Sequence, residues 1–588
     1  MKAKHIFKTC AAAAVAVATL ASCSDFLTIY PTDKTVGEDF WKKKADVQEM
    51  ATGAYKQFAN GPIQERSIVW GGFRSDELVK REGQSNANLD NINVVNILPD
   101  NAYTSWGDFY AVINRCNLVL KHSPGVMEVD PEFTQGDYDV IKAQMLALRS
   151  LCYFYLVRTF RDVPYTTQGY DNDNMDFTLP QTAPDSVLQY CIRDLEEAGK
   201  TIMKSGAYGQ GDWRNKGYFT ADAVNALLAD IHLWRGSMNH HAESYRKCVE
   251  YADKVIDAKD KYYRSVRRTQ ATSTEEDDKY HLTSAKMMAW YNIFTTGNDH
   301  ESILEMQYDG GNNSNSTLAN WYYEGSAGGQ PIVMASKLFT GQSEQANTLE
   351  GTALYATLKD YRYWNDCYDV GNREATQLSI RKMTSNSTTL IDPSKSGVTG
   401  EKRNTTRPYD NFKQNWIVYR LTDVMLMKAE ALVQLAGAEG DTQLEDAFWL
   451  VQKVNKRSLA DNIAEKDTLK PSNFNTKEAM EALVLAERGR ELAFEGKRWY
   501  DLVRFCYRHM DGVNYSALMA DQTEWPALYG PMIKMIVRKY ESGGDAMSFK
   551  MKSEPFLYMP IEESETKVNP LLKQNPVFKE KSTTTKTT

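Results

Sequence analysis

The sequence predicts a mainly α-helical protein whose helices pack in pairs, interrupted by one loop-rich, irregular region. Three observations indicate this fold class. Apolar residues recur at steps of three and four in several long blocks. Alanine occupies many of these positions, and such small side chains let neighbouring helices approach closely. Runs rich in glycine, asparagine and serine replace the helical pattern between residues 261 and 415.

The predicted helices follow one another in pairs along the chain. In the first of them Ala143, Ala147 and Phe154 fall on one face, and the later blocks show the same pattern. The blocks are expected near 141–160 with 185–203, 220–236 with 242–258, 420–436 with 443–457, and 476–495 with 497–506. Their spacing is irregular and lacks the full consensus of a known repeat, so the periodicity suggests repeats without demonstrating them.

The N-terminus has the features of a secretory signal. Lysines at positions 2, 4 and 8 precede an apolar run over residues 10–21, which is too short to remain as a membrane span. The run ends in Leu20-Ala21-Ser22-Cys23, which looks like a bacterial lipobox with Cys23 as the acylated residue. Acyl chains on Cys23 would anchor the protein to a membrane, because each buried methylene contributes about 0.8 kcal/mol. An ordinary soluble secretory signal is the alternative.

Composition narrows the class of protein. The 588 residues are 42% hydrophobic and 25% charged, as in a globular protein with a large core, and no apolar stretch of spanning length is expected after residue 23. A formal net charge of −8 argues against nucleic acid or an anionic lipid surface as the main partner. Six cysteines remain after Cys23, most within apolar helical patterns and without a CxxC pair, so we expect buried free thiols.

Four stretches of the chain resemble those of a known family. They are residues 23–27 with Pro31, Phe40-Trp41 and Gly53-Ala54-Tyr55; residues 147–164; residues 487–502; and residues 559–576. Together, and in this order, they resemble the SusD/RagB family of outer-membrane nutrient-binding lipoproteins. Arg161 stands where the family usually has glycine, which we expect to alter only a turn.

The resemblance implies both a fold and a function. It implies a scaffold of tetratricopeptide-like helix pairs with a loop-rich region that carries the ligand. It also implies a lipoprotein on the outer membrane, facing the cell exterior, that binds an oligo- or polysaccharide and delivers it to a SusC-like TonB-dependent transporter for import. Such proteins bind without catalysis, and we expect no cofactor. A peptide-binding RagB-like member, a lipid-anchored glycoside hydrolase and a purely structural scaffold are the alternatives.

The signal, the composition and the resemblance together divide the chain. The expected segments are a signal peptide at 1–22, an N-terminal helical region at 23–260, a variable ligand-binding region at 261–415, C-terminal helix pairs at 416–510, a family C-terminal region at 511–580 and a disordered tail at 581–588.

Charged residues are concentrated in the third of the family-like stretches. Glu487, Glu491 and Glu495 recur every four residues among arginines, and we expect Arg488–Glu491 and Glu495–Arg498 pairs on a helix. Paired carboxylates could perform acid–base chemistry. Cations within reach would lower the pKa of each acid, however, so the sequence predicts a structural ion cluster.

Sugar binding needs exposed aromatic rings with polar groups at their rim. Trp321-Tyr322-Tyr323, between two glycine-rich runs, are the first candidates, and at least one of these rings is expected to be exposed. Trp70 and Tyr103 flank a polar segment that includes Asn91, and Trp290 and Trp364 are further candidates. Trp234, Trp449 and Trp499 lie in helical blocks and are expected in the core. Residues 171–176 are acidic but lack the pattern of a calcium loop, so no metal site is predicted.

Overall fold

The computed structural model describes residues 40–578 with the exception of 173, 268–278, 285–288, 312, 326–329, 341–353, 371, 373–374, 399–410 and 541–542. Cys23, the signal peptide and the tail predicted at 581–588 lie outside these residues.

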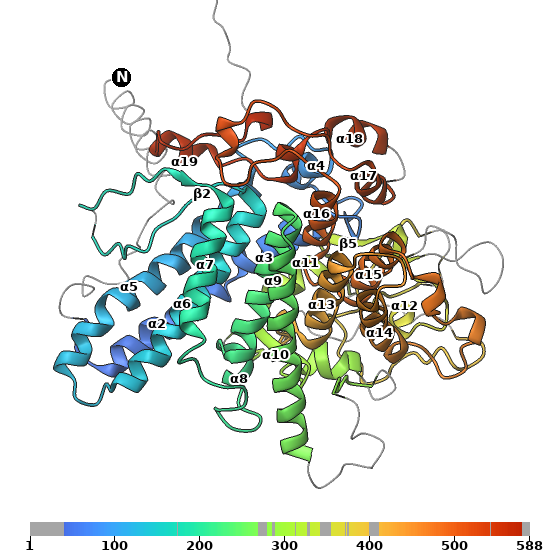
Figure 1. The fold of residues 1–588 in the computed structure, drawn as a ribbon, viewed down its shortest axis with the longest axis horizontal. Coiled ribbons are helices and arrows are strands. Elements are labelled where there is room, and N and C mark those ends of the chain that lie inside the picture. The colour runs from blue at the N-terminus through green and yellow to red at the C-terminus, as the bar shows by residue number, and fades with distance from the viewer. Residues whose placement is uncertain are drawn as a thin grey trace, which may run out of the picture.

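A curved row of long helices crosses the molecule from left to right in Figure 1. Its members are α2 (Lys44–Phe58), α5 (Gly107–Val129), α6 (Gln135–Phe160), α7 (Pro184–Ala198), α9 (Ala221–Asn239), α10 (Ala242–Arg267), α13 (Leu421–Leu435), α14 (Thr442–Arg457), α15 (Lys477–Glu491) and α16 (Arg498–Arg508). Each helix packs against the next, and α16 also packs back onto α9. All eight predicted blocks are helices close to their expected bounds, which confirms a mainly α-helical fold built from packed helix pairs.

Local chemistry sets where these helices begin and which face they bury. Thr134 caps α6 by accepting from the Asp137 N–H, while the Asp137 carboxylate accepts from the Thr134 N–H. On α14, Ala447 and Val451 face the core and are fully buried. Trp449 is two residues from each and so lies on the opposite face, where it is 49% exposed. The expectation that Trp449 belongs to the core is therefore wrong.

Helix α6 is apolar because it lies at the centre of the protein. Within the described residues it is the one helix with the length and hydropathy of a membrane span, and 83% of its most apolar window is buried. The expectation that no apolar stretch of membrane-spanning length follows residue 23 is therefore wrong, since α6 has that length and hydropathy. Burial between α5 and α7 accounts for the apolar sequence without a membrane. The six cysteines that follow Cys23 are all buried and free, as predicted.

Short strands and helices cover one side of the row. The strands are β1 (Leu78–Lys80), β5 (Val333–Ser336) and β6 (Gln377–Leu378) in one antiparallel sheet, β2 (Val163–Pro164) with β3 (Gln181–Thr182), and β4 (Ser302–Met306) with β7 (Trp416–Arg420). The short helices are α3 (Gly61–Ile68), α4 (Ala87–Asn93), α8 (Arg214–Gly217), α11 (Ser316–Tyr322), α12 (Tyr361–Asn365), α17 (Gly530–Val537), α18 (Gly544–Lys550) and α19 (Glu563–Val568). The last three lie across the top of Figure 1, where α17 and α18 are close to α4.

The predicted charge cluster is buried where α15 meets β7 and α12. Glu491 accepts from Arg362 at 3.0 Å, from Arg420 at 2.6 Å and from Arg457. Burial alone would raise the pKa of Glu491, but Arg457, Arg420 and Arg362 together hold this pKa below its usual value. The pKa values of Glu487 and Glu495 are lowered in the same way. These carboxylates are therefore ionised structural partners rather than proton donors.

The two pairings expected within this cluster are wrong. Arg488 pairs with Asp423 at 3.0 Å and with Asp501 at 2.9 Å, and Arg498 pairs with Asp76 at 2.8 Å. Helix α15 ends at Glu491, so Glu495 is not one helical turn from Arg498. Partners from distant segments replace the neighbours that the sequence spacing suggested.

Candidate functional site

The aromatic residues predicted to bind ligand are buried. Their exposed fractions are 0% for Trp70, Tyr322 and Tyr323, 2% for Trp321, 5% for Trp364, 6% for Tyr103 and 8% for Trp290. Asn91, on α4, is partly exposed. The expectation that one ring of residues 321–323 is exposed is wrong, because α11 packs against α3 and Phe412 contacts Tyr323.

Internal hydrogen bonds hold these rings in two groups. In the first, the Trp70 indole donates to the Tyr103 carbonyl at 2.8 Å, and the Tyr103 and Trp321 rings meet edge-on at 5.9 Å. In the second, the Trp290 indole donates to Asp366 at 2.7 Å, two residues beyond Trp364. The structure thus brings Trp70, Tyr103 and Trp321 together and leaves the other pair elsewhere.

A cleft beside Trp213 has a volume of about 730 Å³. We call it the Trp213 cleft. Four segments line it, together with Leu148 and Asn298: residues 52–61 at the junction of α2 and α3, residues 213–219 around α8, residues 304–309 on β4 and the turn that follows it, and residues 313–317 at the start of α11. A cleft of this size accommodates a small oligomeric ligand.

One wall of the Trp213 cleft is aromatic. Trp213 is 46% exposed, and its ring lies against the backbone of Gly217, where a Cβ would come within 2.7 Å of the indole. Tyr218 meets Trp213 edge-on at 5.3 Å, and Tyr55 packs on Tyr218 at 4.5 Å. The indole is therefore supported from behind while part of its surface faces solvent.

Amide and hydroxyl groups lie beside this aromatic wall, since a Cβ on Gly217 would come within 2.7 Å of the Gln307 side chain as well as of the indole. Asn298 and Gln307 exchange two amide hydrogen bonds of 3.0 Å, and Asn313 donates to the Gln307 carbonyl at 3.0 Å. Backbone N–H groups of Asn313 and Gly311 hold the pKa of the exposed Asp309 below its usual value. Fixed amides beside an exposed aromatic ring are an arrangement that binds hydroxyl-rich ligands.

Glu305 is a buried carboxylate in this lining, and it is 2% exposed. Its Oε2 accepts from the Asn415 amide at 2.7 Å and from the Asn298 N–H at 3.0 Å. Its Oε1 has no hydrogen-bond partner among the described residues. A buried acceptor of this kind is costly unless a donor reaches it.

The cleft is linked to the predicted Trp321 by the contact between α3 and α11. These helices pack closely where they begin, since a Cβ on Gly61 would come within 2.7 Å of the Thr317 hydroxyl. Trp321 follows Thr317 by one helical turn. Trp321, predicted to bind ligand, is therefore buried one helical turn away from the lining residue Thr317.

Sequence reasoning missed Trp213 itself. Its signal was the run Gly209-Gln210-Gly211-Asp212 directly before it, outside any helical pattern. Both glycines adopt positive φ, so this run is a tight turn that presents the tryptophan at the surface.

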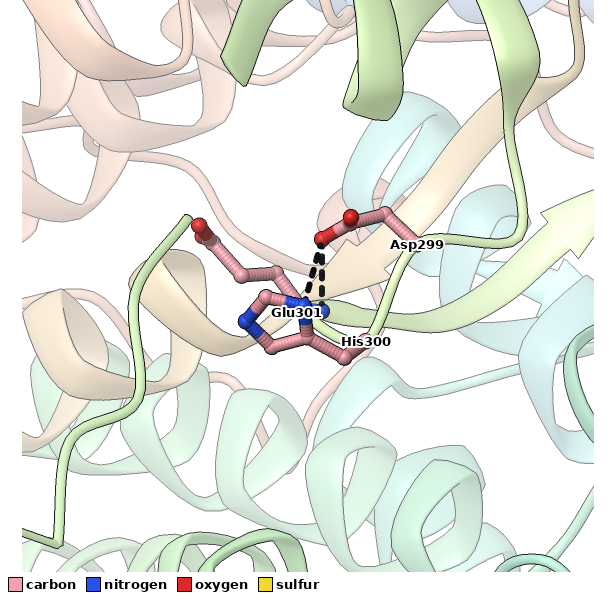
Figure 2. A group of neighbouring side chains, drawn as sticks. All are labelled: Asp299, His300 and Glu301. Carbon is pink, nitrogen blue, oxygen red and sulfur yellow. Dashed lines mark hydrogen bonds and ion pairs between the residues drawn. The ribbon is translucent and has the colours of Figure 1, made fainter. Parts of the chain in front are cut away.

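Asp299, His300 and Glu301 place their ligand-type atoms within 4.8 Å of one another (Figure 2). The His300 ring faces Asp299 through Nδ1 at 3.4 Å and the His281 carbonyl through Nε2 at 2.8 Å. Nε2 must donate to that carbonyl and so offers no lone pair to a metal, while Nδ1 faces the Asp299 carboxylate. Arg457 also contacts Glu301 at 3.0 Å. The group is an ion-pair cluster around His300.

This cluster predicts a pH-dependent contribution to stability. Burial alone would lower the pKa of His300, but the hydrogen bond and charge of Asp299 outweigh it and raise the pKa. A raised folded-state pKa stabilises the protein below the unfolded value of about 6.5, and the contribution is lost as pH rises through the folded value. We expect His300→Gln to lower the free energy of unfolding by about 1.5 kcal/mol at pH 5.5 and by less at pH 8.5, measured by urea unfolding. If the loss of unfolding free energy in His300→Gln were the same at both pH values, the pairing of His300 with Asp299 would be contradicted. Asp299→Asn removes the same pair and should show the same larger loss at pH 5.5 than at pH 8.5.

Two sequence-family models match this chain. The sequence model described as the SusD family matches residues 284–578, and one described as "Starch-binding associating with outer membrane" matches residues 25–233. The SusD-like protein P38 of Formosa agariphila is 24% identical over 554 residues, covering 88% of this chain and 95% of that protein. None of these descriptions names a catalytic activity.

Solved structures share the architecture. A SusD homologue from Bacteroides thetaiotaomicron superposes with a TM-score of 0.64 at 18% identity, over 91% of this chain and 97% of that one. A structure described as a laminarin-binding SusD-like protein gives a TM-score of 0.60 at 20% identity, over 91% and 99% of the two chains. At these identities the likeness shows the fold.

Proposed function

The chain belongs to the SusD family, and from this premise we propose that it binds an oligo- or polysaccharide in the Trp213 cleft and delivers it to a SusC-like TonB-dependent transporter for import. The observation that carries the proposal is the half-exposed Trp213 ring beside the paired amides of Asn298 and Gln307. Such a ring accepts the C–H face of a sugar, while amides bond its hydroxyl groups. The laminarin-binding neighbour, with the same fold, supports a glycan as the ligand.

The proposal includes a place for the protein. Acylation of Cys23 would hold it on the outer membrane, facing the cell exterior, and the family-model description that names the outer membrane supports this. The predicted residues Trp321 and Tyr103 would act from behind the cleft, by fixing α11 and α3 in place. Asn91, which is partly exposed on α4, stays a candidate for contact with a more extended ligand, whereas Trp70, Trp290 and Trp364 are buried and would act only by supporting the surface.

Hydrolysis is the rival chemistry, because Glu305 and Asp309 both line the cleft. A glycoside hydrolase needs one carboxylic acid that stays protonated and donates. The backbone N–H groups that lower the pKa of Asp309 make it a poor donor. We therefore propose binding without catalysis, and expect no release of reducing ends from any glycan that binds.

The test is affinity electrophoresis of residues 24–588, which include every described residue, through gels containing plant, microbial or host glycans. We expect one glycan class to retard the protein, and Trp213→Ala to weaken that binding at least tenfold, about 1.4 kcal/mol. Trp449→Ala is the matched control, since Trp449 is 49% exposed but lies on α14, outside the cleft.

Three outcomes count against the proposal. Unchanged binding by Trp213→Ala would move the site elsewhere on the protein. Retardation by no glycan would favour peptide capture, as in a RagB-like member of the family. Release of reducing ends would make the protein a hydrolase.

A further inference from the structure

We infer that the Trp213 cleft selects uncharged glycans over anionic ones, such as uronic-acid-containing or sulfated polymers. This inference rests on the proposed function and names the substrate class of the same site. It follows from the charges that line the cleft and from the unpartnered oxygen of Glu305.

The fixed charges of the cleft are mainly negative. Among the described residues of its lining, Lys56 is the one exposed cation, whereas Glu305 and Asp309 supply two carboxylates. Arg214 stands next to Trp213, but its guanidinium already forms a two-pronged pair with Asp212 at 2.6 and 3.0 Å. An anionic ligand would therefore meet the negative charges of Glu305 and Asp309 and, among the described lining residues, the single positive charge of Lys56.

Glu305 contributes more than its charge. Its Oε2 is held by Asn415 and the Asn298 N–H, so the side chain cannot turn away, and its Oε1 lacks a donor among the described residues. A carboxylate accepts hydrogen bonds and donates none. A sugar hydroxyl can supply the missing donor, whereas a carboxylate or sulfate on the ligand cannot.

Burial makes this discrimination strong. Glu305 is 2% exposed, so water screens it poorly and a second negative charge nearby costs more than at the surface. A neutral ring stacked on Trp213, with a hydroxyl directed at Glu305, satisfies the cleft without that penalty. The same cleft would disfavour a uronate or a sulfate ester in that position.

The test compares neutral and anionic polymers that share one backbone. Laminarin is paired with sulfated laminarin, and hydroxyethylcellulose with carboxymethylcellulose. A third pair consists of any glycan that binds in the electrophoresis screen and its oxidised or sulfated derivative. With residues 24–588 at 150 mM salt, we expect the neutral member of the binding pair to bind at least tenfold more tightly. Equal or tighter binding of the anionic member would overturn the inference while leaving the proposed function intact. Failure of every polymer in the screen would overturn the proposed function itself.

Two isosteric variants assign the selectivity to residues. In Glu305→Gln the remaining carbonyl can keep both bonds of Oε2, and the amide replaces the unpartnered Oε1. We expect the ratio of neutral to anionic affinity to fall about tenfold, because the repelling charge is gone. Asp309→Asn should lower the ratio by a smaller factor, since Asp309 is exposed. Glu445→Gln, beside Trp449 on α14, is the control outside the cleft. An unchanged ratio in Glu305→Gln would contradict the role of Glu305.

Discussion

Glu491→Gln is expected to lower the free energy of unfolding by about 3–5 kcal/mol. Glu491 is 3% exposed and is shared by the guanidinium groups of Arg362, Arg420 and Arg457. The amide removes the charge that these three cations surround and turns N–H donors toward groups that can only donate. Charges buried without compensation are among the most destabilising features a substitution can produce.

Urea unfolding at pH 7 measures this effect, and the pH dependence checks its cause. Because the folded-state pKa of Glu491 is lowered, its contribution is present above the unfolded value of about 4.3 and is lost as pH falls toward the folded value. The gap between wild type and variant should therefore narrow in acid. Glu250→Gln is the control: Glu250 pairs with Lys247 and Lys254 at the surface and should change stability by less than about 1 kcal/mol. Equal effects of the two substitutions would contradict the structural role of the buried cluster.

Gly71→Ala is expected to cost about 3 kcal/mol or more, or to prevent folding. Gly71 lies in the helical turn η1 (Val69–Phe73), and a Cβ there would overlap the carbonyl of Gly496. Gly496 has a φ of +68° and in turn approaches the Ser67 carbonyl, so neither backbone can retreat. Close backbone contact at both glycines explains why a single methyl group has a large effect.

Gly125→Ala is the matched control for this substitution. Gly125 is on the exposed side of α5, and a Cβ there would meet nothing within 4 Å. Alanine should stabilise the helix by about 0.5–1 kcal/mol. Thermal unfolding of the two variants, with soluble yield recorded, separates the cases. A Gly71→Ala protein as stable as Gly125→Ala would show that the two segments do not meet as described.

The helical rows could be predicted from the sequence because their signal is local. The block expected at 220–236 is α9 (Ala221–Asn239), and the block expected at 420–436 is α13 (Leu421–Leu435). Apolar periodicity reports which face of a helix is buried, whichever element buries it. The partners of Glu491 could not be predicted, since Arg362 and Arg420 are 129 and 71 residues away in the sequence. Local residue spacing carries no information about which distant segments come together in the fold.

The candidate site was harder to predict for the same reason. Trp321 lies beside glycine-rich runs, which is typical of exposed loops, yet the contact with Tyr103 buries it. Trp213 has a similar local setting and is half exposed. What separates the two is the tertiary neighbour: α3 covers α11, whereas among described residues Trp213 rests on Gly217 with its outer side uncovered.

The long reach of the buried ion pairs has a consequence for how the chain folds. Asp76 pairs with Arg498 across 422 residues, and Glu77 accepts from the Phe494 N–H across 417. Asp76 therefore has no Arg498 to pair with until 498 of the 588 residues, about 85% of the chain, have been made. Contacts between such remote segments are slow to form, because a very long loop must close before they contribute. The segment that carries Asp76 and Glu77 thus stays without these partners through most of synthesis, and this part of the core is completed late, from the C-terminal end.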